Sequence, residues 1–149
     1  MIKIILNNKK AFYDYFLDKK YIAGIQLLGN EVKSIRLKKV NLQNSYIKIE
    51  SNEIFVFNMF VEKYEFCNKF DYDDKRKKKL LLNKREILQI KKTIQVKGLS
   101  VIPTKIISDR NLLKLEIYLA RGKKKYDKRL ILKKKDDDLK IKKTLSYIY

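Results

Sequence analysis

Histidine is absent from this chain, and cysteine occurs once, as Cys67. The lack of histidine removes the commonest general base and metal ligand of proteins. A single cysteine cannot form an intrachain disulfide or a cysteine-based zinc site, and without histidine it lacks its usual activating partner as a nucleophile. We therefore expect Cys67 to be incidental to function, and the protein to be a non-enzyme that uses no cofactor or metal.

Nucleotide-binding and membrane signatures are also missing. Neither G-x-x-x-x-G-K-[ST] nor G-x-G-x-x-G occurs, so the sequence has no phosphate-cradling glycine loop of those two kinds. Residues 1–6 form too short a stretch to be a signal peptide, and no apolar run approaches the length needed to span a bilayer. These observations predict a cytoplasmic protein with no membrane partner.

Acidic residues are scarce relative to basic ones. The chain has 37 Lys and Arg residues against 17 Asp and Glu residues, which gives a net charge of +20. A field of this size favours polyanionic partners, with nucleic acid first and an anionic membrane second. An AT-biased genome would also favour lysine, but the same bias should raise glutamate, which stays low. The 149 residues, of which 45% are hydrophobic, predict one compact domain with room for a tail.

The hydrophobic pattern changes from strand to helix near residue 29. Residues 24–29 hold apolar residues between two glycines, as in a short strand. Asn30 then fits a helix N-cap, and Glu31 falls in the first turn, where the helix dipole favours an anion. We predict a strand that runs directly into a helix, with Glu31 close to the cations Lys33 and Arg36.

The rest of the pattern predicts a mainly β fold. We expect helices over residues 9–17 and from an Asn83 cap to Gly98, and we expect Phe12 and Phe16 of the first helix to be core residues. A long loop is expected over residues 62–74. The expected strands cover residues 3–6, 21–28, 45–50, 54–61, 99–107, with Pro103 at an edge or bulge, and 113–119. Together these elements predict an α+β fold, mainly β with short helices: an OB-like closed antiparallel barrel of about six strands with three flanking helices.

The composition changes abruptly after Ala120. Residues 121–149 contain twelve basic residues against four acidic ones, and Ile141, Leu145 and Ile148 form only a partial helical stripe. Such a segment cannot offset its own ordering entropy by burying apolar surface. We predict an RNA-binding domain over residues 1–120 and a basic C-terminal tail over residues 121–149 that is disordered until it meets a polyanion.

Residues 24–36 resemble the A-G-I-x-L-x-G-x-E-V-K-S-x-R segment of the SmpB family. Further blocks resemble the same family in the same order: residues 8–11 with 14–16, 41–42 with 44–46, 79–86, and 120–124 with 126–129. The resemblance therefore runs from residue 8 to about residue 132. The chain departs from the family pattern at Asn30, where Thr or Trp is usual, at Tyr126, where some members have His, and from Lys133 onward.

This resemblance implies a fold, a function and partners. It implies a β-barrel with flanking helices, and a C-terminal tail that becomes helical on the ribosome. The family is an RNA-binding adaptor that binds the tRNA-like domain of transfer-messenger RNA (SsrA) and delivers it to stalled ribosomes for trans-translation. The implied partners are this RNA, the ribosomal decoding centre and message channel with their ribosomal RNA, and elongation factor Tu through the charged RNA. We expect a monomer.

The resemblance also implicates individual positions. It implies RNA contacts for Glu31, Leu81 and Asn83; with neighbouring cations they form a barrel set, Glu31, Lys33, Arg36, Lys79, Leu81 and Asn83. It implies ribosomal function for Gly122 and residues 127–129; with their neighbours they form a tail set, Gly122, Lys123, Lys124, Tyr126, Asp127, Lys128 and Arg129. Other roles stay open, since Asn83 could be only a helix cap and Leu81 only core. Glu31 would have to accept hydrogen bonds from base edges or order cations such as Lys33 and Arg36.

Two other functions fit the sequence less well. A basic structural ribosomal protein that binds ribosomal RNA would share the charge, the barrel and the tail. A nuclease would need a carboxylate cluster for a metal ion, and only Asp71, Asp73 and Asp74, or residues 136–138, come near one.

Overall fold

The computed structural model of the protein describes residues 2–67 and 70–123. Its helices are α1 (Lys9–Asp14), α2 (Gly29–Arg36) and α3 (Lys84–Lys97). Its strands are β1 (Ile2–Asn7), β2 (Tyr15–Ile25), β3 (Val40–Asn41), β4 (Tyr46–Glu50), β5 (Glu53–Phe57), β6 (Phe60–Val61), β7 (Lys78–Leu81), β8 (Ser100–Asp109) and β9 (Leu112–Gly122).

Six antiparallel strands follow one another around a ring. The order is β8-β4-β5-β7-β2-β9, and β9 pairs again with β8. β1 adds to β8, while β3 and β6 form a separate two-stranded sheet. The contact between β4 and β8 is the thinnest, because it consists of one register pair, Ile47 with Val101. The prediction of a mainly β fold with about six ring strands and three helices is confirmed; an OB-like closed barrel stays a prediction.

One hydrophobic core unites the ring and two helices. Strand residues such as Ile54 and Leu115 are fully buried, and α2 and α3 add Ile35 and Ile90 to the same cluster. In α3, Ile87 and Ile90 are buried and Ile94 is half-buried. The helix ends as predicted at Gly98, whose left-handed φ of 64° suits a residue without a Cβ.

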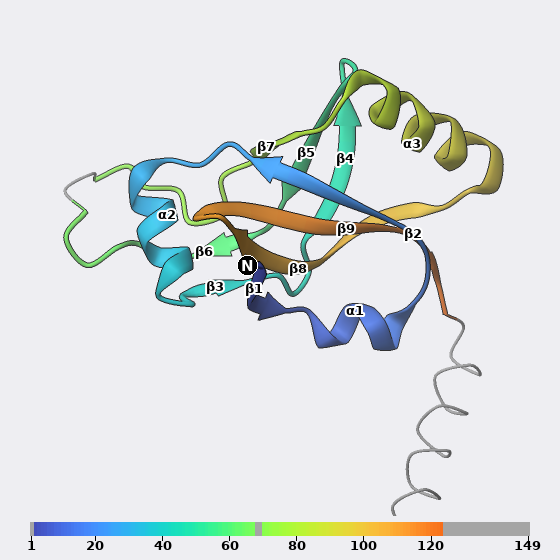
Figure 1. Cartoon of the computed structure of the whole chain (residues 1–149). Helices are drawn as coiled ribbons and strands as arrows, with labels where there is room; N and C mark the ends of the chain where they lie inside the picture. Colours follow the sequence, from blue (N-terminus) through green and yellow to red (C-terminus); the bar gives the residue numbers. More distant parts are fainter. Residues whose placement is uncertain (1, 68–69, 124–149) are drawn as a thin grey trace, which may run out of the picture.

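The helices lie on different sides of the strand ring (Figure 1). In that view α2 and residues 62–67 and 70–74 of the long loop lie on the left, α3 lies at the upper right, and α1 lies below the strands. The chain therefore presents several distinct surfaces. No helix within residues 2–67 and 70–123 has the length and apolar character to cross a membrane.

Several expected bounds are wrong, because strand pairing overrides the local pattern. The first helix ends at Asp14 rather than at residue 17, since β2 begins at Tyr15 and pairs with the end of β9. Phe12 and Phe16 are exposed, not core. The expected strand over residues 54–61 divides into β5 and β6 around Asn58, which has a positive φ of 59°.

The predicted irregularity at Pro103 is present. The β8–β9 register shifts between Pro103 and Lys105, which leaves Thr104 as the extra residue of a bulge. The Thr104 hydroxyl donates to two oxygens of Glu116, the backbone carbonyl oxygen and the carboxylate Oε1, each at 3.1 Å. Glu116 is therefore buried on β9, although strand alternation would place it among the solvent-facing residues.

The two faces of α3 should respond differently to truncation. Ile90 is fully buried, whereas Leu88 on the same helix is 52% exposed. We expect Ile90→Ala to lower the free energy of unfolding by about 2–4 kcal/mol through lost burial and a residual cavity. Leu88→Ala is the matched control and should change it by less than about 0.5 kcal/mol. Urea denaturation measures both, and equal effects would show that α3 does not pack as described.

Candidate nucleic-acid interface

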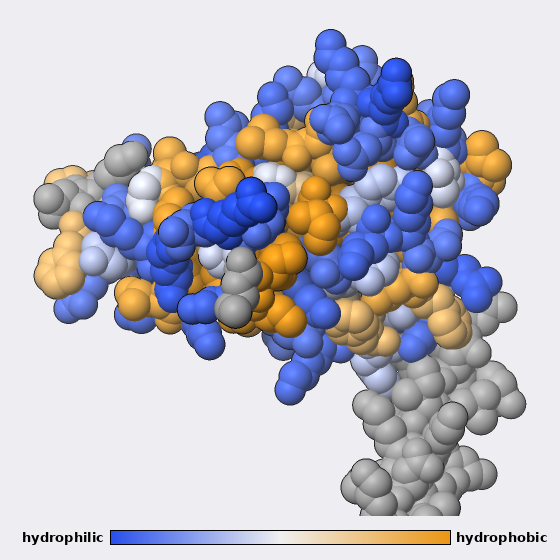
Figure 2. Space-filling model, in the orientation of Figure 1, coloured by the Kyte–Doolittle hydropathy of each residue, from blue (hydrophilic) through white to orange (hydrophobic). Residues whose placement is uncertain are grey.

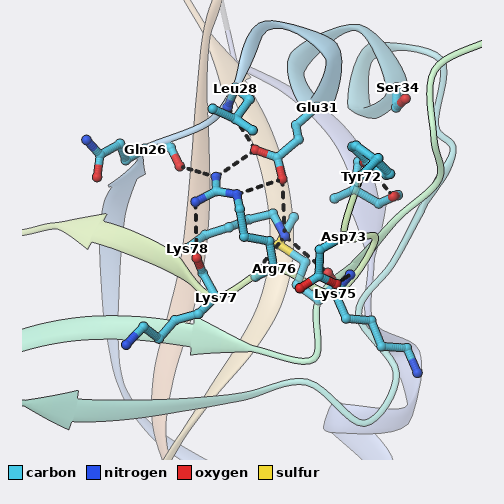
Figure 3. A network of polar contacts seen from close by, with 12 residues as sticks. Gln26, Leu28, Glu31, Ser34, Tyr72, Asp73, Lys75, Arg76, Lys77 and Lys78 are labelled. Carbon is cyan, nitrogen blue, oxygen red and sulfur yellow. Dashed lines mark hydrogen bonds and ion pairs between the residues drawn. The ribbon is translucent and has the colours of Figure 1, made fainter. Parts of the chain in front are cut away.

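The corner between β2 and α2 is built around a buried carboxylate, Glu31 (Figure 3). The helix begins at Gly29 with Leu28 as the N-cap, so Asn30 is not the cap that the sequence suggests. Glu31 Oε1 accepts a 2.8 Å hydrogen bond from the Leu28 backbone N–H, which is otherwise unpaired at a helix start. The glutamate side chain thus closes the first turn of α2 from inside the protein.

Two cationic side chains that are distant in the sequence, Arg76 and Lys78, contact this carboxylate. Arg76 Nη2 lies 2.7 Å from Glu31 Oε1, and its Nε donates to Oε2 at 3.3 Å. Lys78 Nζ lies 3.6 Å from Oε2 and also donates to the carbonyls of Met59 and Arg76. Glu31, Arg76 and Lys78 form what we call the ion triad, which connects α2 to β7 and to the loop before it.

Burial and charge act in opposite directions within the triad. Burial raises the pKa of Glu31, but hydrogen bonds from Arg76 and Leu28 and the nearby positive charges hold that pKa below its usual value. Burial lowers the pKa of Lys78, and the negative charge of Glu31 opposes this shift. Burial also raises the pKa of Tyr72 to about 12, so its hydroxyl stays protonated and donates to the Val61 carbonyl at 2.7 Å.

Lys79 and Leu81 lie on the outer side of β7, beside β2. Leu81 is 54% exposed, and it pairs in register with Gly24. A Cβ at position 24 would lie only 3.2 Å from the Cβ of Leu81, so the glycine lets the leucine lie across β2. Lys79 pairs with Glu53 at 3.2 Å. Leu81 is therefore a surface residue, and the alternative in which it is only core is wrong.

Asn83 occupies the N-cap position of α3 but makes no side-chain capping hydrogen bond. The side-chain cap expected from Asn83 is therefore absent, although the helix begins where the sequence predicts. The Asn83 side chain is exposed, and the residue lies two positions after the end of β7. Its amide therefore does not cap its own helix.

Comparison with known proteins agrees with this geometry. A family model described as SmpB protein matches residues 5–147. The chain belongs to the SmpB family. An SsrA-binding protein of Carboxydothermus hydrogenoformans is 46% identical over 149 residues, which is the whole of both chains. Another from Thermoanaerobacter pseudethanolicus is 49% identical over 91% of this chain and 86% of its own.

A solved structure also matches. It is described as tmRNA-SmpB at the center of the bacterial ribosome, and it superposes with a TM-score of 0.68 and 38% identity. The match covers 83% of this chain and 87% of that one. SmpB is an RNA-binding adaptor family, and the sequence-based assignment to it is confirmed.

The structure divides the barrel set into three groups. Lys79, Leu81 and Asn83 lie together on and just after β7. Lys33 lies over the Tyr64 ring at 5.2 Å, and Arg36 donates to the Asn111 carbonyl at 2.8 Å, so these two face the long loop and the β8–β9 turn. Glu31 is buried. It therefore cannot meet base edges in this structure, and it orders Arg76 and Lys78 rather than Lys33 and Arg36.

The tail set is only partly described. Gly122 is the last residue of β9 and pairs with Tyr15. The Lys123 backbone N–H donates to the Asp14 carbonyl at 2.8 Å, and its Nζ donates to the Phe12 carbonyl at 3.2 Å. Lys124, Tyr126, Asp127, Lys128 and Arg129 lie outside the described residues. β9 continues past residue 120, and the division into residues 1–120 and 121–149 stays a prediction.

Sequence reasoning missed Arg76 and Lys78. Both belong to the basic run 75–79, which reads as one solvated charge cluster. Strand alternation holds the clue, because every second residue of a strand faces inward. Lys78 is fully buried while Lys77 and Lys79 face outward, toward Glu50 and Glu53. The buried acid that this lysine meets, Glu31, lies 47 residues earlier in the chain, and no local pattern reveals that contact.

Acid should weaken the fold through Glu31. Its pKa is lower in the folded protein than its unfolded value of about 4.5, so its contribution is complete above that pH and is lost as the pH falls toward the folded pKa. We expect Glu31→Gln to cost about 3 kcal/mol at pH 7, because Lys78 keeps a buried charge without a counter-ion. The variant should then lose less stability than the wild type below about pH 4.5.

Urea unfolding at neutral and acidic pH tests this prediction. The exposed Glu65, in the loop over residues 62–74, offers the matched substitution Glu65→Gln, which should leave stability at pH 7 unchanged. A Glu31→Gln variant as stable as Glu65→Gln at pH 7 would contradict the structural role of the triad.

Proposed function

We propose that this protein is an RNA-binding adaptor that binds the tRNA-like domain of transfer-messenger RNA and delivers it to stalled ribosomes for trans-translation. The match over its whole length to an SsrA-binding protein carries the proposal. In this role it acts in the cytoplasm as a monomer without catalysis of its own. Its other partners are the decoding centre, the message channel and, through the charged RNA, elongation factor Tu.

The RNA contacts of the barrel lie around β7 and the start of α3. Lys79 supplies positive charge, Leu81 an exposed apolar side chain for a sugar or base, and Asn83 an amide with both donors and an acceptor. Figure 2 shows hydrophobic residues surrounded by hydrophilic ones across one face of the molecule. Mixed surfaces of this type suit folded RNA, which presents phosphates, sugars and unstacked bases together.

Glu31 acts through Arg76 in this proposal. Its carboxylate is inaccessible, but it holds the Arg76 guanidinium, whose side chain is 33% exposed. Arg76 Nη2 also donates to the Gln26 carbonyl, next to the β2–β7 pairing. Glu31 is thus a positioning residue, and Arg76 is the group that can meet a phosphate.

The first residues of the tail are held by hydrogen bonds to the folded domain. Gly122 and Lys123 are held against Tyr15 and Asp14 at the junction of α1 and β2. A basic segment that folds on RNA from this point can enter an empty message channel, because about twenty helical residues reach roughly 30 Å. This is the role that we propose for the tail set.

A structural ribosomal protein is the main alternative, and a nuclease the next. The ribosomal alternative predicts a preference for a ribosomal RNA site over a tRNA-like elbow. Sequencing the RNA that copurifies from cells decides between them. For the nuclease, the described residues contain no group of three or more Cys, Asp and Glu side chains placed to hold a metal ion, and residues 136–138 lie outside that part of the chain.

Asn83→Ala should weaken binding of a tRNA-like RNA by about 1–3 kcal/mol, because its exposed amide loses polar contacts. Stability should change little, since the side chain makes no capping bond. Asn7→Ala, an exposed asparagine at the end of β1, is the matched control and should bind like the wild type. Gel shift and thermal melts measure both; unchanged RNA affinity in a folded Asn83→Ala variant would remove Asn83 from the interface.

A chain that ends after Lys123 should fold, because β9 and its contacts with α1 remain complete. It should bind transfer-messenger RNA with a shallower salt dependence, since phosphate-neutralising cations are gone. It should not support peptide tagging in a reconstituted rescue reaction on ribosomes with an empty A site. Full tagging by this truncated chain would exclude the tail from the mechanism.

Replacement of Tyr126, Lys128 and Arg129 by Ala should reproduce the tagging defect without changing affinity for free RNA. The matched control replaces Lys142, Lys143 and Tyr147, which removes the same charge and one tyrosine from the far end of the tail. Equal defects in the two triple variants would show that only the charge of the tail matters.

A further inference from the structure

A groove opens where the strand ring is thinnest. β4 pairs with β8 only through Ile47 and Val101, whereas β4 and β5 continue as a hairpin to Glu50 and Glu53. Residues 48–50 therefore have no strand partner in β8, and α3 lies beside the tip of this hairpin (Figure 1). The space between β4, the second half of α3 and the start of β8 measures about 620 Å³. We call it the α3–β4 groove.

The groove combines an apolar lining with a basic rim. Ile49, Ile94 and Leu99 are among its apolar residues, and Tyr15 and Tyr46 add two aromatic rings. Two lysines, Lys48 and Lys91, stand on its two walls, and none of the described residues that line it is acidic. Lys91 Nζ reaches across to the Asn52 side-chain oxygen at 3.3 Å, and Gln95 adds a second amide to the lining.

These groups match the parts of a nucleotide. Lysines on both walls suit a phosphate, aromatic rings suit a base, and amide side chains suit base edges. Tyr46 already stacks on Phe57 with a centroid distance of 5.3 Å and keeps 46% of its surface exposed. The volume lies within the range of small-molecule sites and exceeds what a packing defect leaves.

An added peptide strand fits less well. The unpaired edge of β4 covers only residues 48–50, whereas strands usually have about five or six residues, so an added strand would make few main-chain hydrogen bonds. A basic rim without acidic residues also gives no reason to favour peptide over a polyanion. We propose that the α3–β4 groove binds an unstacked nucleotide of a single-stranded RNA segment.

This site is separate from the proposed transfer-messenger RNA contacts. None of the barrel set lines the groove. Tyr15, which lines it, pairs with Gly122, so the groove ends where the tail begins. An RNA strand held there would lie beside the base of the tail. The inference rests on the proposed function only for RNA as the class of ligand.

Binding of a short oligonucleotide tests the groove with the full chain. The probe is fluorescein-labelled oligouridylate of about eight nucleotides, followed by fluorescence anisotropy. The groove variant is Lys48→Glu with Lys91→Glu. The control is Lys3→Glu with Lys92→Glu, which changes the net charge equally but uses exposed lysines on β1 and α3 that do not line the groove.

We expect the groove variant to bind the probe about tenfold more weakly than the control does, because it replaces the phosphate-facing cations. An abasic ribose-phosphate oligomer of the same length should bind the wild type about tenfold more weakly than oligouridylate, because it cannot stack. Thermal melts establish that both variants are folded. Equal affinities in the two variants, or equal affinities for abasic and uridine probes, would overturn the proposal.

A peptide of alternating acidic and apolar residues serves as the competing ligand. If this peptide binds the wild type and loses binding in the groove variant while oligouridylate affinity stays unchanged, the groove is a strand-docking site and the proposal is wrong. The proposed function can fail separately. If the wild type does not bind tRNA-like RNA, but the groove variant still binds oligouridylate more weakly than the control does, the adaptor role is wrong and the groove site stands.

Discussion

The buried charge of Glu31 is the interaction on which the rest of the structure depends. Its carboxylate satisfies the start of α2, holds Arg76, and neutralises Lys78 in a place without access to water. Lys78 in turn donates to the Met59 carbonyl, which ties down the chain between β5 and β6. A buried network of this kind is costly when one member is lost, so its geometry specifies how helix, strand and loop meet.

This arrangement gives an RNA-binding protein both order and exposed charge. Strand alternation divides the basic run 75–79, so that Lys78 points into the core while Lys77 and Lys79 face outward. The outward lysines are partly neutralised by Glu50 and Glu53, and they stay available for exchange with phosphate because exposed ion pairs contribute little stability. The inward charge stabilises the fold, and in the function that we propose the outward charges meet RNA.

The strand ring also explains why the protein offers surfaces in several directions. β7 and the start of α3 present Leu81 and Asn83, the end of β9 leads into the tail beside Tyr15, and the thin β4–β8 contact opens the α3–β4 groove. Each surface arises at a strand end or at an interruption in pairing. At such places some backbone and side-chain groups make no hydrogen bonds within the sheet, so they can contact a ligand.

The sequence by itself determined the charge, the mainly β class, the helix from residue 84 to Gly98, an irregularity at Pro103 and membership of the SmpB family. The first four depend on composition, periodicity and local backbone chemistry, and the family assignment depends on the resemblance of sequence motifs; all can be read along the chain. Only the tertiary structure decided that α1 stops at Asp14, that Leu81 is exposed, and that Glu31 is buried against Arg76 and Lys78. These outcomes follow from pairing between distant residues, where a long-range strand or ion contact outweighs a preference of a few tenths of a kcal/mol at each position.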